Sequence, residues 1–352
     1  KKSTTFAVVN EVGAYGRPRV QTKFIFMTDN KMRTEILNID KGQCLTDVLP
    51  AIPANTIFDK TITGCGATHS EIVNAARHSI IIEPNIPVIL GKKAEHPFLF
   101  AVYEGITKED VKAYLAGEHD GYRKIITTPE GFDKKVLPAM HELEIPVYKD
   151  YFLLFDECEK AIQDVGYRGD IYLPVEDFFK FENKAMVSAT PIVPSDPRFE
   201  ENGFKILKLV PTYDSRIELT LCTTNNTVAV MRKLLKRLEN ETVCVFLNST
   251  ETILSLIYAL GLQGRSRVFC SEKSVRKLKQ INFTDASETL DELAPVNFLT
   301  SRFYAAVDIK LDYKPHVILL TDVMRAPFSA VDPQTEAVQI VGRFRNGVED
   351  AA

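Results

Sequence analysis

The chain has 352 residues, of which 45% are hydrophobic and 26% charged, and its formal net charge is −4. This length exceeds one ordinary hydrophobic core and predicts two domains of about 150 residues with an extension. The slightly negative balance excludes a globally basic surface, so any nucleic-acid partner would have to be held by a local groove.

The distribution of apolar residues and cysteines predicts neither a membrane protein nor a secreted protein. No run approaches about 18 uninterrupted apolar residues, so neither a membrane span nor a membrane partner is expected. The first residues, Lys1 to Thr5, lack the apolar run of a signal peptide. The six cysteines form no Cys-x-x-Cys pair, which is typical of reduced thiols in a cytoplasmic protein.

Residues 1–49 are expected to form a short β-rich N-terminal extension. Two extended apolar runs, 23–27 and 34–39, flank the turn-prone sequence Asp29-Asn30-Lys31 and predict a hairpin.

Residues 50–192 alternate short apolar runs with amphipathic stretches. Strands are expected at 79–83, 123–128, 151–155 and 184–187, and helices between them, including one at 108–116. Such alternation is typical of βαβ units and predicts an α/β domain with a parallel sheet.

A Pro-rich stretch follows and predicts a linker over 193–215. The alternation then resumes over 216–352, which predicts a second α/β domain. Strands are expected at 242–247 and 317–320, and helices at 228–239, at 250–260 ending before Gly261, and at 335–341.

A glycine-rich turn lies between a short apolar segment and a helix expected to begin at Ser70. It reads Gly64-Cys65-Gly66-Ala67-Thr68. Two glycines spaced by one residue permit a tight turn whose amides face a phosphate, and the helix N-terminus adds positive potential. Thr68 stands where a hydroxyl would coordinate magnesium. An ordinary strand-to-helix turn is the alternative.

An acidic pair, Asp156-Glu157, directly follows the apolar run at 151–155. A carboxylate at the carboxyl end of a buried parallel strand points into the crevice where ligands bind. Asp156 would hold magnesium, and Glu157 would orient or deprotonate an attacking water. The alternative is a helix N-cap, where acidic residues are also favoured.

Two further motifs lie at strand and helix ends. Ser188-Ala189-Thr190 follows a short strand, where its hydroxyls could couple a nucleotide site to the second domain; a strand-ending turn is the alternative. Near the C-terminus, Gln339 precedes Gly342-Arg343 and Arg345, an arrangement typical of an arginine finger.

In this order, the four motifs resemble motifs I, II, III and VI of superfamily 2 helicases, the DExD/H-box class. Segments 83–87, 127–130, 245–249 and 300–309 resemble motifs Ia, Ib, IV and V. The resemblance covers roughly residues 50–350.

The resemblance implies two tandem RecA-like domains that bind ATP and Mg²⁺ and move along, or separate, strands of single-stranded DNA or RNA. The phosphate loop 64–68, Asp156 and Glu157 would serve the nucleotide, and Gln339 with Arg343 or Arg345 would face the γ-phosphate. Ser188 and Thr190 would couple the domains. The residues expected near the strand's backbone are Asn85, Thr128, Asn248 and Thr300.

Ala67 departs from the family pattern, which has lysine there. Lys60 precedes the loop and Lys92 follows it, but the sequence does not show whether either reaches the site. Position 67 is expected in a solvent-lined loop, so a lysine placed there should change catalysis more than stability. An ATP-dependent helicase, acting as a monomer or within a replication or recombination assembly, and a nucleotide- or nucleic-acid-binding scaffold without turnover both remain open.

Overall fold

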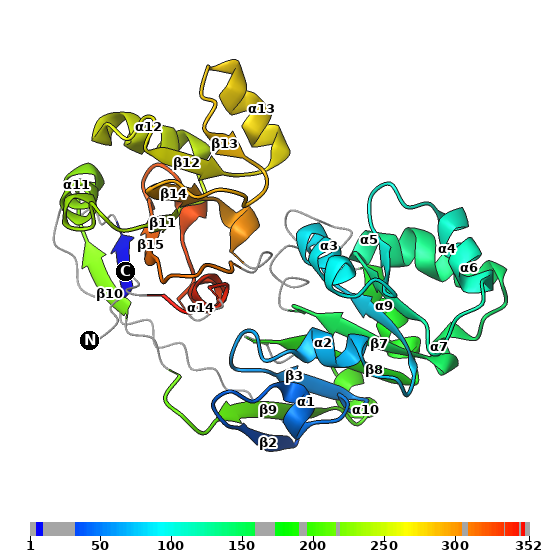
Figure 1. Cartoon of the computed structure of the whole chain (residues 1–352). Helices are drawn as coiled ribbons and strands as arrows, with labels where there is room; N and C mark the ends of the chain where they lie inside the picture. The colour runs from blue at the N-terminus through cyan, green and yellow to red at the C-terminus, as the bar shows by residue number, and fades with distance from the viewer. Residues whose placement is uncertain are drawn as a thin grey trace. The chain divides into compact units, whose positions relative to one another are not determined.

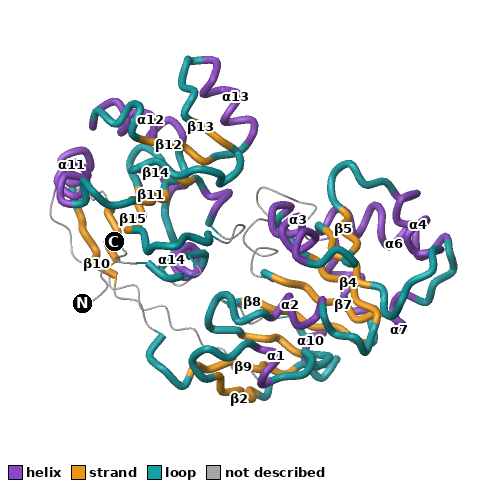
Figure 2. Tube along the Cα trace, viewed as in Figure 1, coloured by secondary structure: helices purple, strands orange, loops and turns teal. Residues whose placement is uncertain are grey.

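The computed structural model describes residues 5–9, 32–158, 173–189, 196–215, 219–304, 309–333, 335–344 and 346–348 (Figure 1). The chain divides into two compact units. One is Thr28–Ser215, here called the first unit; the other, the second unit, combines Lys1–Met27 with Arg216–Ala352. Each unit has its own parallel sheet, and the predicted strands around Phe155 and Phe246 lie in different sheets (Figure 2). This confirms the predicted α/β class with two parallel-sheet domains.

The sheet of the first unit has eight strands in the order β2-β9-β3-β8-β7-β4-β6-β5. Every neighbouring pair for which the register is defined is parallel. The strands are β2 Thr34–Ile39, β3 Thr56–Asp59, β4 His78–Ile82, β5 Phe100–Val102, β6 Lys124–Thr127, β7 Tyr151–Asp156, β8 Asn183–Ser188 and β9 Lys205–Pro211.

Helical segments connect these strands, as a parallel sheet requires. They are α1 Leu45–Val48, α2 Ala67–Ile72, α3 Ile86–Glu95, α4 Lys108–Ala116, α5 Pro129–Gly131, a π-helical turn Phe132–Val136, α6 Leu137–Glu142, α7 Val147–Asp150, α9 Leu173–Lys180 and α10 Arg198–Glu201. The predicted helix at 108–116 is confirmed, whereas α2 begins three residues before the expected Ser70.

Strand β7 shows why the apolar runs of this unit form central strands. All six of its residues are buried. Leu153 and Phe155 pack into one apolar cluster, while Phe152 and Leu154 pack into another. Because successive side chains point to opposite faces of a strand, an uninterrupted apolar run fits a sheet that is covered on both sides.

The sheet of the second unit has seven strands in the order β10-β1-β15-β11-β14-β12-β13, again with parallel pairs. The strands are β1 Thr5–Val9, β10 Leu219–Thr223, β11 Val243–Phe246, β12 Ser266–Phe269, β13 Ala286–Ser287, β14 Val296–Leu299 and β15 His316–Thr321. The strands predicted at 242–247 and 317–320 correspond to β11 and β15.

The helices of the second unit are α11 Thr227–Arg237, α12 Thr250–Leu260, α13 Glu272–Gln280 and α14 Glu336–Gly342, with 3₁₀ turns at Ser301–Phe303 and Pro327–Ser329. Gly261 caps α12 with φ 69°, a left-handed conformation that glycine adopts without strain. In the described residues, no helix is long and apolar enough to cross a membrane.

The N-terminal segment adds strands to both sheets. β1 lies between β10 and β15, and β2 pairs with β9. Residues 23–27, the expected hairpin partner of 34–39, lie outside the described residues.

The expected linker also contributes to the first sheet. Residues 193–215 include α10 and β9, and β9 pairs with both β2 and β3. The Pro-rich sequence therefore precedes a last strand of the first unit, and the two units divide at Ser215.

Candidate nucleotide site

The carboxyl ends of β3, β8 and β7 meet at one edge of the first sheet. Asp59 ends β3 opposite Ser188, which ends β8, and Asp156 ends β7 opposite Val187. This edge is where parallel α/β sheets bind ligands. The sheet therefore brings the glycine-rich loop after β3 and the acidic pair after β7 to the same place, although about 90 residues separate them in the chain.

The loop between β3 and α2 has the tight geometry that its glycines permit. Gly64 has φ 76° and Gly66 has φ 88°, both in the left-handed region. Thr61 has φ 49°, which is unusual for a β-branched residue. Its hydroxyl is hydrogen-bonded to the carbonyl oxygen of Leu209, a contact with β9 that holds the start of the loop.

Three main-chain donors of this loop remain available to an anion. Within the described part of the chain, the N–H groups of Thr63, Gly64 and Gly66 make no hydrogen bond to another protein group. Gly64 is exposed, and the other two are partly exposed. Adjacent N–H groups of this kind form a concave site for phosphate.

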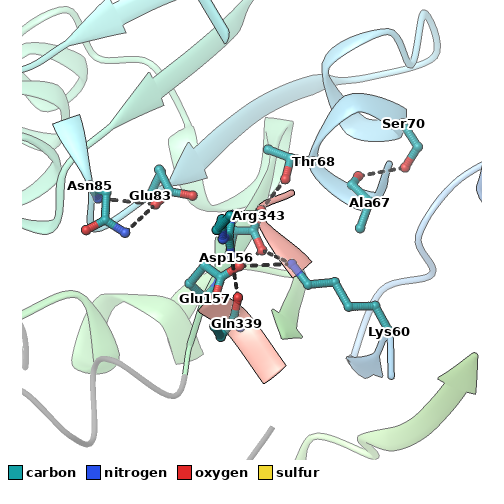
Figure 3. Close-up of polar contacts among 10 residues, drawn as sticks. All are labelled: Lys60, Ala67, Thr68, Ser70, Glu83, Asn85, Asp156, Glu157, Gln339 and Arg343. Carbon is teal, nitrogen blue, oxygen red and sulfur yellow. Dashed lines mark hydrogen bonds and ion pairs between the residues drawn. The ribbon is translucent and has the colours of Figure 1, made fainter. Parts of the chain in front are cut away.

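Thr68 and Asp156 are in direct contact. The hydroxyl of Thr68 donates a hydrogen bond to Oδ2 of Asp156 (Figure 3). Asp156 is 1% exposed, and its Oδ1 accepts the main-chain N–H of Glu157 at 2.9 Å. Glu157 itself has φ 49° and is 5% exposed, so the turn after β7 holds its carboxylate beside that of Asp156. This arrangement joins the two motifs that the sequence placed far apart.

Lys60, for which the sequence left the question open, reaches this site. Its ammonium lies 3.3 Å from Oδ1 of Asp156 and 3.1 Å from Oε1 of Glu157 (Figure 3). The signal was its position directly after the buried strand β3, which fixes its backbone at the ligand-binding edge. The other lysine considered, Lys92, instead pairs with Glu95 on α3 at 2.9 Å.

Position 67 is not solvent-lined, so that expectation was wrong. Ala67 is 3% exposed and packs, with Cys65, into an apolar cluster of the first unit. It is the first residue of α2. Burial raises the pKa of the Cys65 thiol, so this cysteine stays protonated and serves packing.

Ser188 contacts the site through its main chain. Its carbonyl oxygen accepts the N–H of Lys60 at 2.9 Å, and Ser188 is fully buried. Thr190 lies outside the described residues. The bonds of Ser188 therefore link β8 to the start of the phosphate loop, and its coupling role remains an expectation.

In the second unit, Gln339 lies on α14, and Arg343, one turn later, is the C-cap residue of that helix. Both are buried, at 3% and 6% exposure, and the Arg343 guanidinium donates to Oε1 of Gln339. The carbonyl oxygen of Arg343 also accepts the N–H of Ile309 at 2.8 Å. Arg345 lies outside the described residues.

The two expected nucleic-acid contacts of the first unit follow neighbouring strands. Asn85 follows β4, and both its main-chain N–H and its side-chain amide donate to Oε1 of Glu83, at 3.2 and 3.3 Å. Thr128 follows β6, and its hydroxyl accepts the N–H of Gly131 at 3.0 Å as the N-cap of α5. The Thr128 hydroxyl is thus already used to begin a helix.

The two expected contacts of the second unit also lie together. Oδ1 of Asn248 accepts the N–H of Ser301 at 3.4 Å, directly after Thr300. The Thr300 hydroxyl donates to the carbonyl oxygen of Phe269 at 3.3 Å, and Thr300 is 8% exposed. Asn248 and Thr300 thus border the carboxyl ends of β11 and β14.

The donor set of the first unit fits magnesium. A hydroxyl and a carboxylate oxygen are hard ligands, and Thr68 and Asp156 already bring them into contact. In the described residues, no cluster of three or more His, Cys, Asp or Glu side chains forms a protein-only metal site.

No family model and no curated protein match this chain. Among solved structures, it is similar to S. cerevisiae Dbp5 bound to RNA and ADP BeF3, with 12% identity and a TM-score of 0.49 over 83% of this chain and 76% of that one. It is also similar to Mycobacterium smegmatis helicase Lhr bound to ssDNA and AMP-PNP, with 12% identity and a TM-score of 0.45 over 85% and 43% of the two chains.

A third similar structure is the Pyrococcus furiosus Hef helicase domain, with 12% identity and a TM-score of 0.45 over 84% and 91% of the two chains. The two parallel sheets of the described residues define the fold class.

Proposed function

We propose that this chain is an ATP-dependent nucleic-acid helicase or translocase of superfamily 2. The observation that carries the proposal is the contact of the Thr68 hydroxyl with Asp156 at the carboxyl edge of the first sheet. An ordinary strand-to-helix turn would not need a hydroxyl paired with a carboxylate from another strand. Open main-chain donors in the same loop supply the phosphate-binding half of such a site.

In this proposal, the first unit binds the nucleotide. The N–H groups of Thr63, Gly64 and Gly66 would bind phosphate oxygens, and Thr68 and Asp156 would hold magnesium. When bound, magnesium would neutralise charge on the β- and γ-phosphates. Glu157 would accept a proton from, or orient, the water that attacks the γ-phosphate.

The resemblance assigns Gln339 and Arg343 to the γ-phosphate, and we keep that assignment within the proposal. A guanidinium placed there stabilises negative charge that develops during phosphoryl transfer. The pairing of Arg343 with Gln339 supports it, because the amide limits the orientations of the guanidinium before substrate binds. Arg345 is the other candidate for this role.

We also propose that single-stranded DNA or RNA binds mainly through its backbone. Asn85, Thr128, Asn248 and Thr300 follow strand ends, at the edge where parallel sheets bind ligands. The net charge of −4 gives no global attraction for nucleic acid, so binding would depend on local contacts. Binding should weaken with salt, with a slope corresponding to only a few released counterions.

A binding scaffold without turnover is the second candidate, and Ala67 is the observation that favours it. The position carries no charge to contact the phosphates. The paired carboxylates favour turnover, since phosphate binding alone does not require an acidic residue placed to activate water. Whether it acts alone or in a replication or recombination assembly, the proposed setting is cytoplasmic.

ATP hydrolysis measured with and without single-stranded DNA or RNA tests the proposal. An ATPase rate that rises on addition of either strand supports the helicase or translocase. Nucleotide binding with no hydrolysis under any of these conditions supports the scaffold. Absence of nucleotide binding overturns the helicase or translocase and leaves only a scaffold that binds nucleic acid.

A further inference from the structure

The phosphate loop lacks a cation at the usual position. Ala67 has only a methyl group, which is buried in an apolar cluster. A triphosphate brings several negative charges into the site, and such charge is normally met by a protein cation as well as by metal. A replacement would have to approach from another position of the same edge.

Lys60 approaches from the start of the loop. Its side chain is 9% exposed and extends to Asp156 and Glu157, at 3.3 and 3.1 Å. Its main-chain N–H donates to Ser188 at 2.9 Å, and its carbonyl oxygen accepts the N–H of Ile62. The backbone of Lys60 is therefore fixed at both peptide groups, while the four-carbon side chain keeps several rotatable bonds.

The charges around the ammonium change when a metal–nucleotide complex binds. Without it, one lysine faces two carboxylates within a buried site. A divalent cation on Asp156 would repel the ammonium and satisfy the same carboxylate. Phosphate oxygens beside the loop would offer a new negative partner. Both effects favour rotation of Lys60 from the carboxylates towards the phosphates.

We propose that Lys60 is the phosphate-binding lysine of this chain, taking the role that position 67 cannot fill. The inference rests on the proposed nucleotide binding. In the nucleotide-free state, Lys60 neutralises the acidic pair; in the bound state, its ammonium contacts the β- and γ-phosphates. The carbonyl oxygen of Ser188 holds the Lys60 backbone in place, so the main chain of Ser188 has a positioning role.

A purely structural counterion is the competing explanation. A lysine that only neutralises buried carboxylates would affect the stability of the nucleotide-free protein. It would not distinguish a nucleoside diphosphate or triphosphate from a nucleoside monophosphate. The gain in affinity from AMP to ADP and ATP therefore separates the two roles.

Titration calorimetry with AMP, ADP and ATP in the presence of Mg²⁺ measures this gain. We expect Lys60→Met to weaken ADP and ATP binding by about 10–100-fold, the loss typical of a hydrogen bond to a charged group, while AMP binding changes little. Lys60→Arg should restore part of the loss because it retains the charge. Lys92→Met, which removes a lysine paired on α3, should resemble wild type.

A second variant covers the case in which Lys60→Met does not fold. Lys60→Met combined with Glu157→Gln removes one positive and one negative charge together. The double variant should still lose the increase in affinity from AMP to ATP, whereas Glu157→Gln alone should retain that increase.

Three results decide the matter. Loss of the gain with Lys60→Met or the double variant supports Lys60 as the phosphate-binding lysine. An unchanged gain overturns this role and leaves the proposed nucleotide binding intact. Wild-type protein that binds none of the three nucleotides overturns the proposed function and the inference together.

Discussion

The hydroxyl of Thr68 donates a hydrogen bond to Asp156, a residue 88 positions later in the chain. Thr68 lies in the first turn of α2, and Asp156 ends β7. The contact exists because parallel strands place their carboxyl ends at one edge of a sheet. It joins a loop suited to phosphate with a carboxylate suited to magnesium.

Thr68→Val should therefore weaken Mg²⁺-dependent nucleotide binding. Valine keeps the branched shape but removes the oxygen, so a contact to a charged group is lost. We expect about a 10–100-fold decrease in ATP affinity with Mg²⁺, and little change with EDTA. Thr68→Ser keeps the hydroxyl and is the matched control. Equal affinities of the valine and serine variants with Mg²⁺ would contradict the metal role.

Glu157→Gln should separate binding from turnover. The amide has nearly the shape of the carboxylate but cannot accept a proton from water. We expect ATP hydrolysis to fall by about 10²–10⁴-fold, the contribution typical of a general base, while ATP still binds. Glu118→Gln, at an exposed position of the same unit, controls for loss of a negative charge. Unchanged hydrolysis would remove Glu157 from the proposed mechanism.

The central strands could be predicted because their residues are apolar on both faces. β7 and β11 appear in the sequence as unbroken apolar runs, which both sides of a covered sheet require. β9 was missed because two lysines interrupt its apolar residues and a Pro-rich segment precedes it. Only pairing with β2 and β3 shows that it belongs to the first sheet.

The sequence placed Asp156 after a buried strand and Thr68 after a glycine-rich loop, and the structure has both there; their roles in the site stay predictions. The approach of Lys60 to the acidic pair could not be predicted, because it depends on the direction of a long side chain after β3. The burial of Ala67 was not predictable either, since the loop sequence does not show that α2 turns its first residue into an apolar cluster. Both outcomes depend on tertiary packing rather than local pattern.

The placement of β1 predicts that residues 1–27 stabilise the second unit. β1 pairs with β10 on one side and with β15 on the other. Without β1, the described sheet would leave β10 with no neighbouring strand. Removal of residues 1–27 should therefore lower the melting temperature of the second unit and increase amide exchange in β10.

Hydrogen exchange resolved by peptide measures this effect, and β4 of the first unit is the internal control. Adding residues 1–27 as a separate peptide should restore part of the protection in β10. Identical exchange in β10 with and without the segment would contradict the pairing.

The buried Lys124 predicts a pH dependence of stability. Its ammonium lies 2.8 Å from the Ser79 hydroxyl and 3.6 Å from Glu71, which also pairs with Arg77. Burial lowers the pKa of Lys124 from 10.5 to about 8. Between these values, the unfolded chain binds a proton that the folded chain has lost. The Lys124 contribution to the free energy of unfolding should therefore rise as pH increases from about 8 to 10.5.

Lys124→Met should remove that contribution. Denaturant unfolding across this pH range gives the slope of the free energy of unfolding against pH for wild type and for the variant. The difference between the two slopes removes the contribution of the other titrating groups. Lys41→Met, at an exposed lysine of the same unit, should keep the wild-type slope. Parallel pH profiles for wild type and Lys124→Met would show that the buried ammonium has an ordinary pKa.

A lysine at position 67 should rescue a protein that lacks Lys60. Ala67 is 3% exposed, so a longer side chain there must displace its neighbours, at a cost of about 1–3 kcal/mol in the free energy of unfolding. In the wild-type background, Lys60 already supplies a cation, and Ala67→Lys should raise turnover only modestly. In the Lys60→Met background, the same substitution should recover ATP affinity and turnover, because the charge returns to the loop.

Ala67→Met is the matched control, since it adds similar length without charge. It should lower the melting temperature as Ala67→Lys does, but it should not rescue Lys60→Met. Glu157→Gln added to the rescued protein should abolish turnover and retain binding, because the restored lysine cannot activate water. Rescue by methionine as well as by lysine would show that packing, rather than charge, connects positions 60 and 67.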